Sequence, residues 1–301
     1  MTYAALLRQT ANRLAARDIY ADWPNEDVSH QTQAEAEQLV CHITGWRRLQ
    51  MLQHLTQCVP QEIIARLEAL SARRVAGDPL AYLIGEIDFY GRAFLARPGC
   101  LIPRPDTEVL VHLAATWIET HLPVARVVDI GAGSGCIAVT LACECPRAQV
   151  HAVDISADAV ALTKDNAARL DAPLTVVKAD GFAWLRERAA EGACVNVIVS
   201  NPPYIPSADI AGLDADVKRH EPHLALDGGS DGLHFYRQFA ALAPTDVFAP
   251  GPAALFLEVG QGQAEMVAAL FDKQPAWAGF SPAIHADLRG VHRVVALTRA
   301  H

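Results

Sequence analysis

From residue 126 onward, short apolar segments alternate with longer segments of helical periodicity. Strand-like runs occur at Arg126–Ile130, Gln149–Val153, Leu174–Val177, Asn196–Val199 and Ala254–Leu257. Each run has the length of a buried strand, and the intervening segments are long enough for helices. This alternation predicts an α/β fold in which helices cover both faces of a parallel sheet. A last run, His292–Thr298, is expected to pair antiparallel at the edge of that sheet.

The N-terminal part of the chain has a different pattern. Residues 1–84 show helical periodicity without a strand-like run, and Thr44-Gly45 and Pro60 are a typical helix end and helix start. Two short β-prone runs around Gly91 predict a hairpin. We therefore expect a small helical bundle over residues 1–84, a hairpin linker over 85–100 and an α/β domain over 101–301.

A glycine-rich loop follows the first strand of the α/β domain. Gly131, Gly133 and Gly135, with Ala132 and Ser134 between them, allow a sharp turn and a close approach of a ligand at the carboxyl edge of the sheet. A dinucleotide site needs G-x-G-x-x-G, and here the third glycine comes one residue early.

Two carboxylates follow the next two strands. Asp154 ends the second strand, where a carboxylate can accept both ribose hydroxyls of a nucleoside, and Asp180 follows the third. We therefore expect a nucleoside-containing cofactor on the loop.

The fourth strand ends in Asn201-Pro202-Pro203-Tyr204. The two prolines stiffen this tetrapeptide and fix the direction of Asn201. The side-chain carbonyl of Asn201 and the main-chain carbonyl of Pro202 are two acceptors that can hold a planar NH2 group by both hydrogens. Positive charge grows on such a nitrogen as it attacks a methyl group, so these acceptors stabilise the transition state more than the ground state. Tyr204 is expected to supply an aromatic wall.

Bulk properties exclude several classes of protein. The formal net charge of -9 gives no overall attraction to nucleic acid, and no apolar run is long enough to span a membrane. The seven cysteines include no C-x-x-C pair, and the spacing of His220 and His223 is not that of a helical zinc site, so no metal is expected. The chain is predicted to be soluble and intracellular.

These motifs are similar to those of known methyltransferases. The glycine spacing resembles the Rossmann-like class I enzymes that use S-adenosylmethionine, and the NPPY tetrapeptide resembles those that methylate planar NH2 groups. Two further segments resemble a smaller group of these enzymes: the string Cys100–Glu108, CLIPRPDTE, and the hairpin Gly85–Phe94 before it. They resemble the peptide chain release factor glutamine methyltransferases, the HemK/PrmC family.

The resemblance implies a reaction and a set of residues. It implies methyl transfer from S-adenosylmethionine to the glutamine of the GGQ motif in class 1 release factors, in the cytoplasm. It also implies that Arg104, Pro105 and Thr107 help to close the cofactor pocket, and that adenine lies beside Asp180. Some family members have an aromatic residue where this chain has Gly181, so Phe182 or another residue would then stack on adenine. The helical domain, which has no comparable polar cluster, is expected to dock the protein substrate.

Three alternatives remain at this point. A related glutamine methyltransferase acts on a ribosomal protein, but it usually departs from the PRPDTE pattern. A nucleic-acid adenine methyltransferase would use the same NPPY but needs a basic surface. A non-catalytic binding module with this fold would be expected to lack the glycine loop or Asn201, and both are present.

Overall fold

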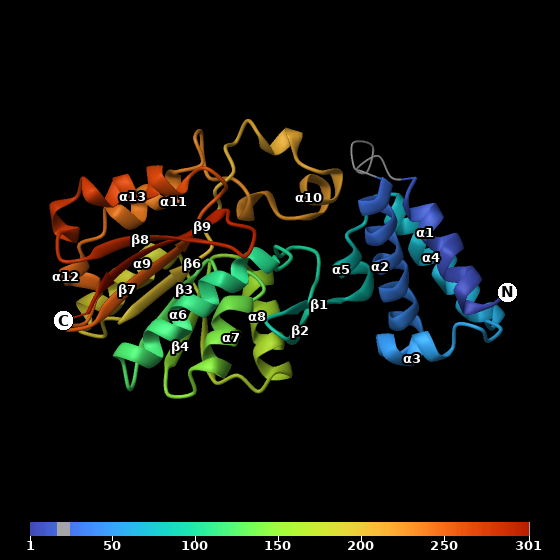
Figure 1. Ribbon diagram of the computed structural model, residues 1–301. Coiled ribbons are helices and arrows are strands. Elements are labelled where there is room, and N and C mark those ends of the chain that lie inside the picture. The colour runs from blue at the N-terminus through green and yellow to red at the C-terminus, as the bar shows by residue number, and fades with distance from the viewer. Residues whose placement is uncertain (17–24, 301) are drawn as a thin grey trace. The chain divides into compact units, whose positions relative to one another are not determined.

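The computed structural model describes residues 1–16 and 25–300, and the chain divides into two compact units. The first unit comprises Met1–Gly85 and Leu213–His220, and the second comprises Glu86–Gly212 and Glu221–His301. The helices of the first unit are α1 (Tyr3–Leu14), α2 (Asn25–Thr44), α3 (Arg48–Gln53), α4 (Gln61–Val75), α5 (Leu80–Ile84) and α10 (Ala215–His220) (Figure 1). The hairpin therefore belongs to the second unit. Residues 213–220 belong to the first unit, and the sequence did not predict this return.

The first unit packs around the apolar faces of its helices. Thr2 begins α1 as its N-cap, where its hydroxyl accepts from the amide of Ala5 at 3.3 Å. Leu14 of α1, Leu39 of α2 and Leu67 of α4 are completely buried in one cluster. The apolar periodicity of the sequence thus becomes the core of this unit.

A buried ion cluster joins residues 213–220 to the helices of the first unit. Arg74 donates hydrogen bonds to both carboxylate oxygens of Glu35, at 2.8 and 2.9 Å, and to Oδ2 of Asp216 at 2.5 Å. Burial alone would lower the pKa of Arg74, but the hydrogen bonds and charges of Glu35 and Asp216 outweigh it and raise the pKa. Arg74 therefore stays charged and holds two acidic residues that are far apart in the sequence.

The second unit contains a hairpin, a seven-stranded sheet and the helices that cover it. The elements that precede the fourth parallel strand are β1 (Glu86–Phe89), β2 (Arg92–Leu95), η2 (Pro105–Thr107), α6 (Glu108–His121), β3 (Arg126–Ile130), α7 (Cys136–Glu144), β4 (Gln149–Asp154), α8 (Ala157–Arg169), β5 (Leu174–Lys178) and α9 (Gly181–Ala190). The remaining elements are β6 (Val197–Ser200), η3 (Ile210–Gly212), η4 (His223–Ala225), α11 (His234–Ala240), α12 (Pro244–Val247), β7 (Ala253–Glu258), α13 (Ala264–Asp272), η5 (Pro275–Trp277), β8 (Ser281–Ala286) and β9 (His292–Arg299).

The strand order of the sheet is β5-β4-β3-β6-β7-β9-β8. The five predicted strands are present and parallel, whereas β9 pairs antiparallel with both β7 and β8. The prediction that the last strand lies at the edge is wrong, because β8 occupies that place. β8 was not predicted from the sequence: it contains Pro282 and is largely exposed, and both are features that an edge strand tolerates.

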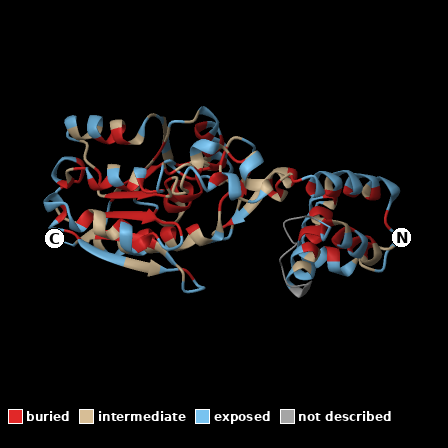
Figure 2. Ribbon diagram, turned by 90° about the horizontal axis from the view of Figure 1, so that it is seen from above, coloured by how far each residue is buried: buried red, intermediate tan, exposed pale blue. Residues whose placement is uncertain are grey.

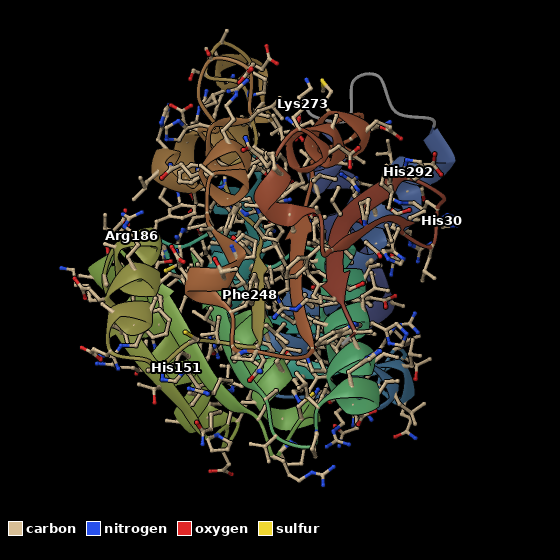
Figure 3. All side chains as sticks on the ribbon, turned by 90° about the vertical axis from the view of Figure 1, so that its left-hand side faces the viewer. His30, His151, Arg186, Phe248, Lys273 and His292 are labelled. Atoms are coloured by element: carbon tan, nitrogen blue, oxygen red, sulfur yellow. The ribbon has the colours of Figure 1, made fainter. Side chains whose placement is uncertain are left out.

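Side chains alternate between two apolar cores on the two faces of the sheet. Val197 and Val199 of β6 belong to the core formed with α6 and α7, and Ile198 belongs to the core formed with α9, α11 and α13. Figure 2 shows the central strands of the sheet in the red of buried residues. Phe248 lies inside, while Arg186 and Lys273 are exposed on the outside (Figure 3). No helix among the described residues is long and apolar enough to cross a membrane.

The ion cluster of the first unit makes a testable prediction. Arg74→Met should remove the cation that pairs with the buried Glu35 and the partly buried Asp216, and lower the free energy of unfolding of this unit by about 3 to 5 kcal/mol. Thermal unfolding, with amide hydrogen exchange in residues 213–220, measures the effect. Arg73→Met is the matched control: the Arg73 side chain is 62% exposed against 7% for Arg74, so its loss should cost about 1 kcal/mol or less. Equal losses in the two variants would contradict the prediction.

Candidate active site

The site lies where the order of the parallel strands reverses. The chain runs from β3 through β4 to β5 on one side, and then returns to β6 on the other side of β3. The loops that follow β3 and β6 are therefore neighbours at the carboxyl edge of the sheet, where open α/β sheets bind ligands. Ser200 at the end of β6 donates a hydrogen bond to the carbonyl of Ile130 at the end of β3, at 2.7 Å.

The glycine loop is held tightly in place by the neighbouring strand. Gly131, Gly133 and Gly135 all have positive φ, of 75°, 58° and 81°, which glycine adopts most easily. The amide of Gly131 donates to the carbonyl of Val153 at 2.9 Å. A Cβ atom on Gly135 would lie 2.7 Å from Thr163, so this position also needs glycine for space.

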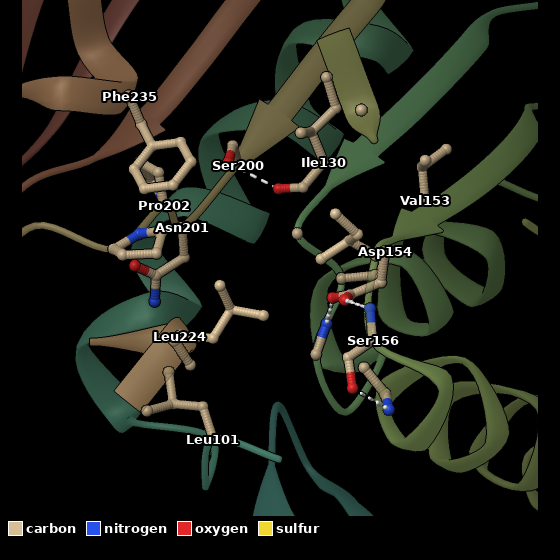
Figure 4. A pocket seen from close by; sticks show the side chains of 18 of the residues that line it. Leu101, Ile130, Val153, Asp154, Ser156, Ser200, Asn201, Pro202, Leu224 and Phe235 are labelled. Atoms are coloured by element: carbon tan, nitrogen blue, oxygen red, sulfur yellow. Dashed lines mark hydrogen bonds between the residues drawn. The ribbon is translucent and has the colours of Figure 1, made fainter. Parts of the chain in front are cut away.

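Asp154 connects the loop to the strand that follows it. Its Oδ2 accepts from the amide of Gly133 at 2.9 Å, and its Oδ1 accepts from the amide of Ser156 at 2.8 Å (Figure 4). A carboxylate has about four acceptor sites, so two remain for hydroxyl groups of a ligand. The geometry is compatible with the expected ribose contact.

Asp180, Gly181 and Phe182 form the start of α9. Asp180 is the N-cap, and its Oδ1 accepts from the amide of Ala183 at 2.8 Å. A Cβ atom on Gly181 would lie only 2.4 Å from Ile130, which explains the small residue at this position. Phe182 is buried and packs edge-on against Phe239, so it forms part of the floor of the site.

The NPPY segment brings Asn201 to Thr107. Nδ2 of Asn201 donates to the hydroxyl of Thr107 at 3.3 Å, which leaves Oδ1 as the acceptor available to a substrate. Tyr204 does not line the cavity among the described residues. Instead, it packs against the apolar core on the α11 side, and its carbonyl accepts from Gln263 at 2.9 Å. Burial raises the pKa of Tyr204 to about 12.

The PRPDTE segment makes further contacts through Arg104 and Asp106. Arg104 forms an ion pair with Glu221, whose Oε2 also accepts from the amide of Ile102 at 3.3 Å. Asp106 pairs with Arg293 of β9 at 2.8 Å. These contacts fix the segment on both sides of Thr107.

These elements surround a cavity of about 370 Å³, within the range typical of small-molecule sites. Asn201 and Asp154 lie on opposite sides of it (Figure 4). Of the residues predicted from the sequence, those lining it are Arg104, Thr107, Gly131, Ala132, Gly133, Ser134, Asp154, Asp180, Gly181, Phe182, Asn201, Pro202 and Pro203. Pro105, Gly135 and Tyr204 do not line it.

The sequence did not predict the apolar wall of the cavity. This wall includes Leu101, Ile155, Leu224 and Phe235. Ile155 and Leu224 are 55% and 60% exposed and both line the cavity, so their side chains offer apolar surface to a ligand there. In the sequence, only Ile155 could have been noticed, because it directly follows Asp154 at the end of a strand.

Two buried carboxyl groups lie near the cavity. Burial raises the pKa of Asp129 to about 8, although a hydrogen bond from the amide of Ala138 opposes the shift. Burial also raises the pKa of Glu258, at the end of β7, to about 7. Within residues 1–16 and 25–300, no group of three or more His, Cys, Asp or Glu residues is placed to hold a metal ion.

Comparison with known proteins gives matches along most of the chain. The family model of the methyltransferase small domain matches residues 107–214, and that of the PrmC N-terminal domain matches residues 5–85. A release factor glutamine methyltransferase of Geobacter sulfurreducens is 41% identical over 262 residues, which cover 87% of each chain. One of Bordetella pertussis is 39% identical over 262 residues, covering 86% of this chain and 92% of the relative. A solved structure of a release factor-specific protein-(glutamine-N5) methyltransferase from Alicyclobacillus acidocaldarius is 42% identical, with a TM-score of 0.46, and covers 69% of this chain and 100% of that one.

The reversed strand order, the glycine loop with its downstream carboxylate and the adjacent NPPY segment define a Rossmann-like methyltransferase. Its similarity to the relatives named above extends over most of both chains. The protein belongs to the family of release factor glutamine methyltransferases.

Methyltransferases of this class use S-adenosylmethionine, and the role of Asp154 can be tested with it. Asp154→Ala should weaken binding of the cofactor by about 10-fold or more, because it removes charged acceptors and releases the glycine loop. Calorimetry measures the affinity. Asp158→Ala, at an exposed position on α8, is the control and should bind as the parent does. Parent-like binding by Asp154→Ala would exclude the ribose contact.

Proposed function

We propose that this protein transfers a methyl group from S-adenosylmethionine to the side-chain amide nitrogen of the glutamine in the GGQ motif of class 1 peptide chain release factors. The orientation of Asn201 at the cavity carries the proposal: its Nδ2 donates to Thr107, which leaves Oδ1 for a substrate. The assignment of a release factor as substrate is supported by the related proteins, which are named release factor glutamine methyltransferases and match over most of both chains.

The lining of the cavity suits the chemistry of the cofactor. Asp154 has acceptor sites left for ribose hydroxyls, and the apolar wall that includes Leu101 and Ile155 suits a flat aromatic base. Arg104 and Thr107 lie at the same cavity, as the proposed closing segment requires. When bound, S-adenosylmethionine supplies an electrophilic methyl group on a sulfonium sulfur.

The residues of the chain would act on the substrate nitrogen. An amide nitrogen is a poor nucleophile, because its lone pair is delocalised into the carbonyl. Oδ1 of Asn201 and the carbonyl of Pro202 can each accept one hydrogen of the glutamine NH2 group, which turns the face of the nitrogen toward the methyl group. As positive charge grows on the nitrogen, both acceptors bind it more strongly. The methylated nitrogen then loses a proton to solvent, since an N-alkylated amide cation is strongly acidic, and no base is required.

The helical unit would bind the release factor outside the reacting loop. The described residues that line the cavity belong to the second unit, and the polar groups of the helical unit include the structural ion cluster around Arg74. Because release factors act in translation, the proposal places the enzyme in the cytoplasm. The net charge of -9 argues against DNA as the substrate.

Asn201→Ala tests the acceptor role. It should lower the rate of methyl transfer by roughly 100-fold to 1,000-fold, the scale of losing one positioned transition-state hydrogen bond. Affinity for the cofactor should change much less. Single-turnover assays with a labelled methyl group, run in parallel on release factor, ribosomal protein and DNA, measure the rate and identify the substrate. Labelling of DNA or of the ribosomal protein in preference to the release factor would refute the proposal.

Asn201→Asp distinguishes positioning from base catalysis. The aspartate keeps an acceptor but loses the Nδ2 donor that bonds to Thr107, so we expect impaired but measurable transfer. A general base at this position would instead make the aspartate variant the faster enzyme, with a new acidic limb in its pH profile. That result would rule out the positioning mechanism.

The docking role of the helical unit can be tested by its removal. The variant must lack residues 1–85 and must also replace 213–220 with a short linker, because both segments build this unit. Transfer to intact release factor should fall by about 30-fold or more, the loss expected from removing one binding hot spot. Transfer to a short GGQ peptide, and affinity for the cofactor, should be nearly unchanged. Equal losses on both substrates would show that the unit does not dock the release factor.

A further inference from the structure

Glu258 is a buried carboxylate directly beside the NPPY segment. It ends β7, whose preceding residues 253–257 are all apolar, and only 2% of it is exposed. β6 and β7 pair so that Ser200 lies opposite Leu257. The next residues along the two parallel strands, Asn201 and Glu258, are therefore neighbours at the carboxyl edge of the sheet.

The side chain of Glu258 interacts with both members of the Asn201–Thr107 hydrogen bond. Hydrogen bonding from the side chains of Thr107 and Asn201 lowers the pKa of this carboxyl group, and Nδ2 of Asn201 donates to the hydroxyl of Thr107 at 3.3 Å. Its Oε2 atom is buried and, among the described residues, has no hydrogen-bond partner. Glu258 does not line the cavity, whereas Thr107 and Asn201 do, so it would influence a substrate only through these two residues.

We propose that Glu258 is a positioning residue for methyl transfer: its carboxylate accepts from Thr107 and Asn201, and so holds Oδ1 of Asn201 toward the substrate nitrogen. This inference rests on the proposed function of Asn201. It assigns to β7 a direct part in the orientation of the NPPY segment.

The direction of the hydrogen bonds among Glu258, Thr107 and Asn201 sets the orientation of the Asn201 amide. An ionised carboxylate can only accept, so the single hydroxyl proton of Thr107 is donated to Glu258. The oxygen of Thr107 then accepts from Nδ2 of Asn201, as the structure shows. An amide group has one donor end and one acceptor end, so committing Nδ2 to this side leaves Oδ1 for the substrate. Charge on Glu258 thus selects one of the two orientations of the Asn201 amide.

The charge on Glu258 also makes this orientation depend on pH. Burial raises the pKa of Glu258 to about 7; Thr107, Arg293 and Asn201 oppose the shift, and Asp106 adds to it. The titratable and charged groups around this carboxyl are Arg293 of β9, Asp106 of η2, Tyr204 after β6, Tyr236 of α11 and Cys136 of α7. As the pH falls through about 7, Glu258 gains a proton and becomes a possible donor, so the Asn201 orientation is lost and the rate should fall.

A double-mutant cycle with Asn201 tests the proposal. Glu258→Gln should lower the single-turnover rate about 10-fold at pH 8 and flatten the acidic limb of the pH profile. In the Asn201→Ala background the same change should alter the rate by less than about 2-fold, because the residue on which Glu258 acts is absent. Glu265→Gln removes an exposed carboxylate of α13 and is the control. An equal loss in both backgrounds would overturn the proposal, because it would indicate a general structural effect.

A second measurement needs no release factor, so it separates this inference from the proposed substrate. The side-chain NH2 signals of Asn201, assigned by their absence in Asn201→Ala, should shift between about pH 6 and 8 in the parent protein as Glu258 titrates. They should not shift in Glu258→Gln. Signals that stay unchanged in the parent, or that titrate equally in both proteins, would refute the link between Glu258 and Asn201, whatever the substrate is.

Discussion

The site depends on one constraint, the reversal of strand order between β3 and β6. Because parallel strands all present their carboxyl ends at one edge, this reversal places the loop after β3 beside the loop after β6 with no helix between them. The hydrogen bond from Ser200 to Ile130 fastens the two strand ends together. A glycine loop and a rigid acceptor thereby share one cavity, although they are far apart in the sequence.

The short segment 104–108 then connects this edge to the rest of the second unit. Its residues reach separate partners: Arg104 pairs with Glu221, Asp106 with Arg289 and Arg293, and Thr107 with Asn201. Glu108 accepts from the amide of Tyr90 in the hairpin at 2.8 Å. These partners lie on different stretches of the chain. This explains why a string of common loop residues can carry so much information: almost every polar side chain in it has a specific partner.

The sequence predicted the alternating strands and helices of the fold, and it predicted the segments of the site in which glycine or proline sets the backbone conformation. The five parallel strands follow from apolar periodicity. The glycine loop follows from its three glycines, which adopt the positive φ angles of the turn. β8 was missed because an exposed edge strand has little apolar pattern. Glu258 was missed although it ends an apolar strand just as Asp154 does, because its role depends on which strands are adjacent, and a single sequence does not give that directly.

The helical unit is built from two separate stretches of the chain, so it cannot be completed until the second stretch has been synthesised. Its ion cluster joins Arg74 to Asp216 across 142 positions of sequence. At 5 to 20 residues per second, the ribosome needs roughly 7 to 28 seconds to proceed from one to the other. During that interval Arg74 has Glu35 as a partner but lacks Asp216. The N-terminal bundle therefore emerges first and is completed only after β6 and Asn201 have been synthesised.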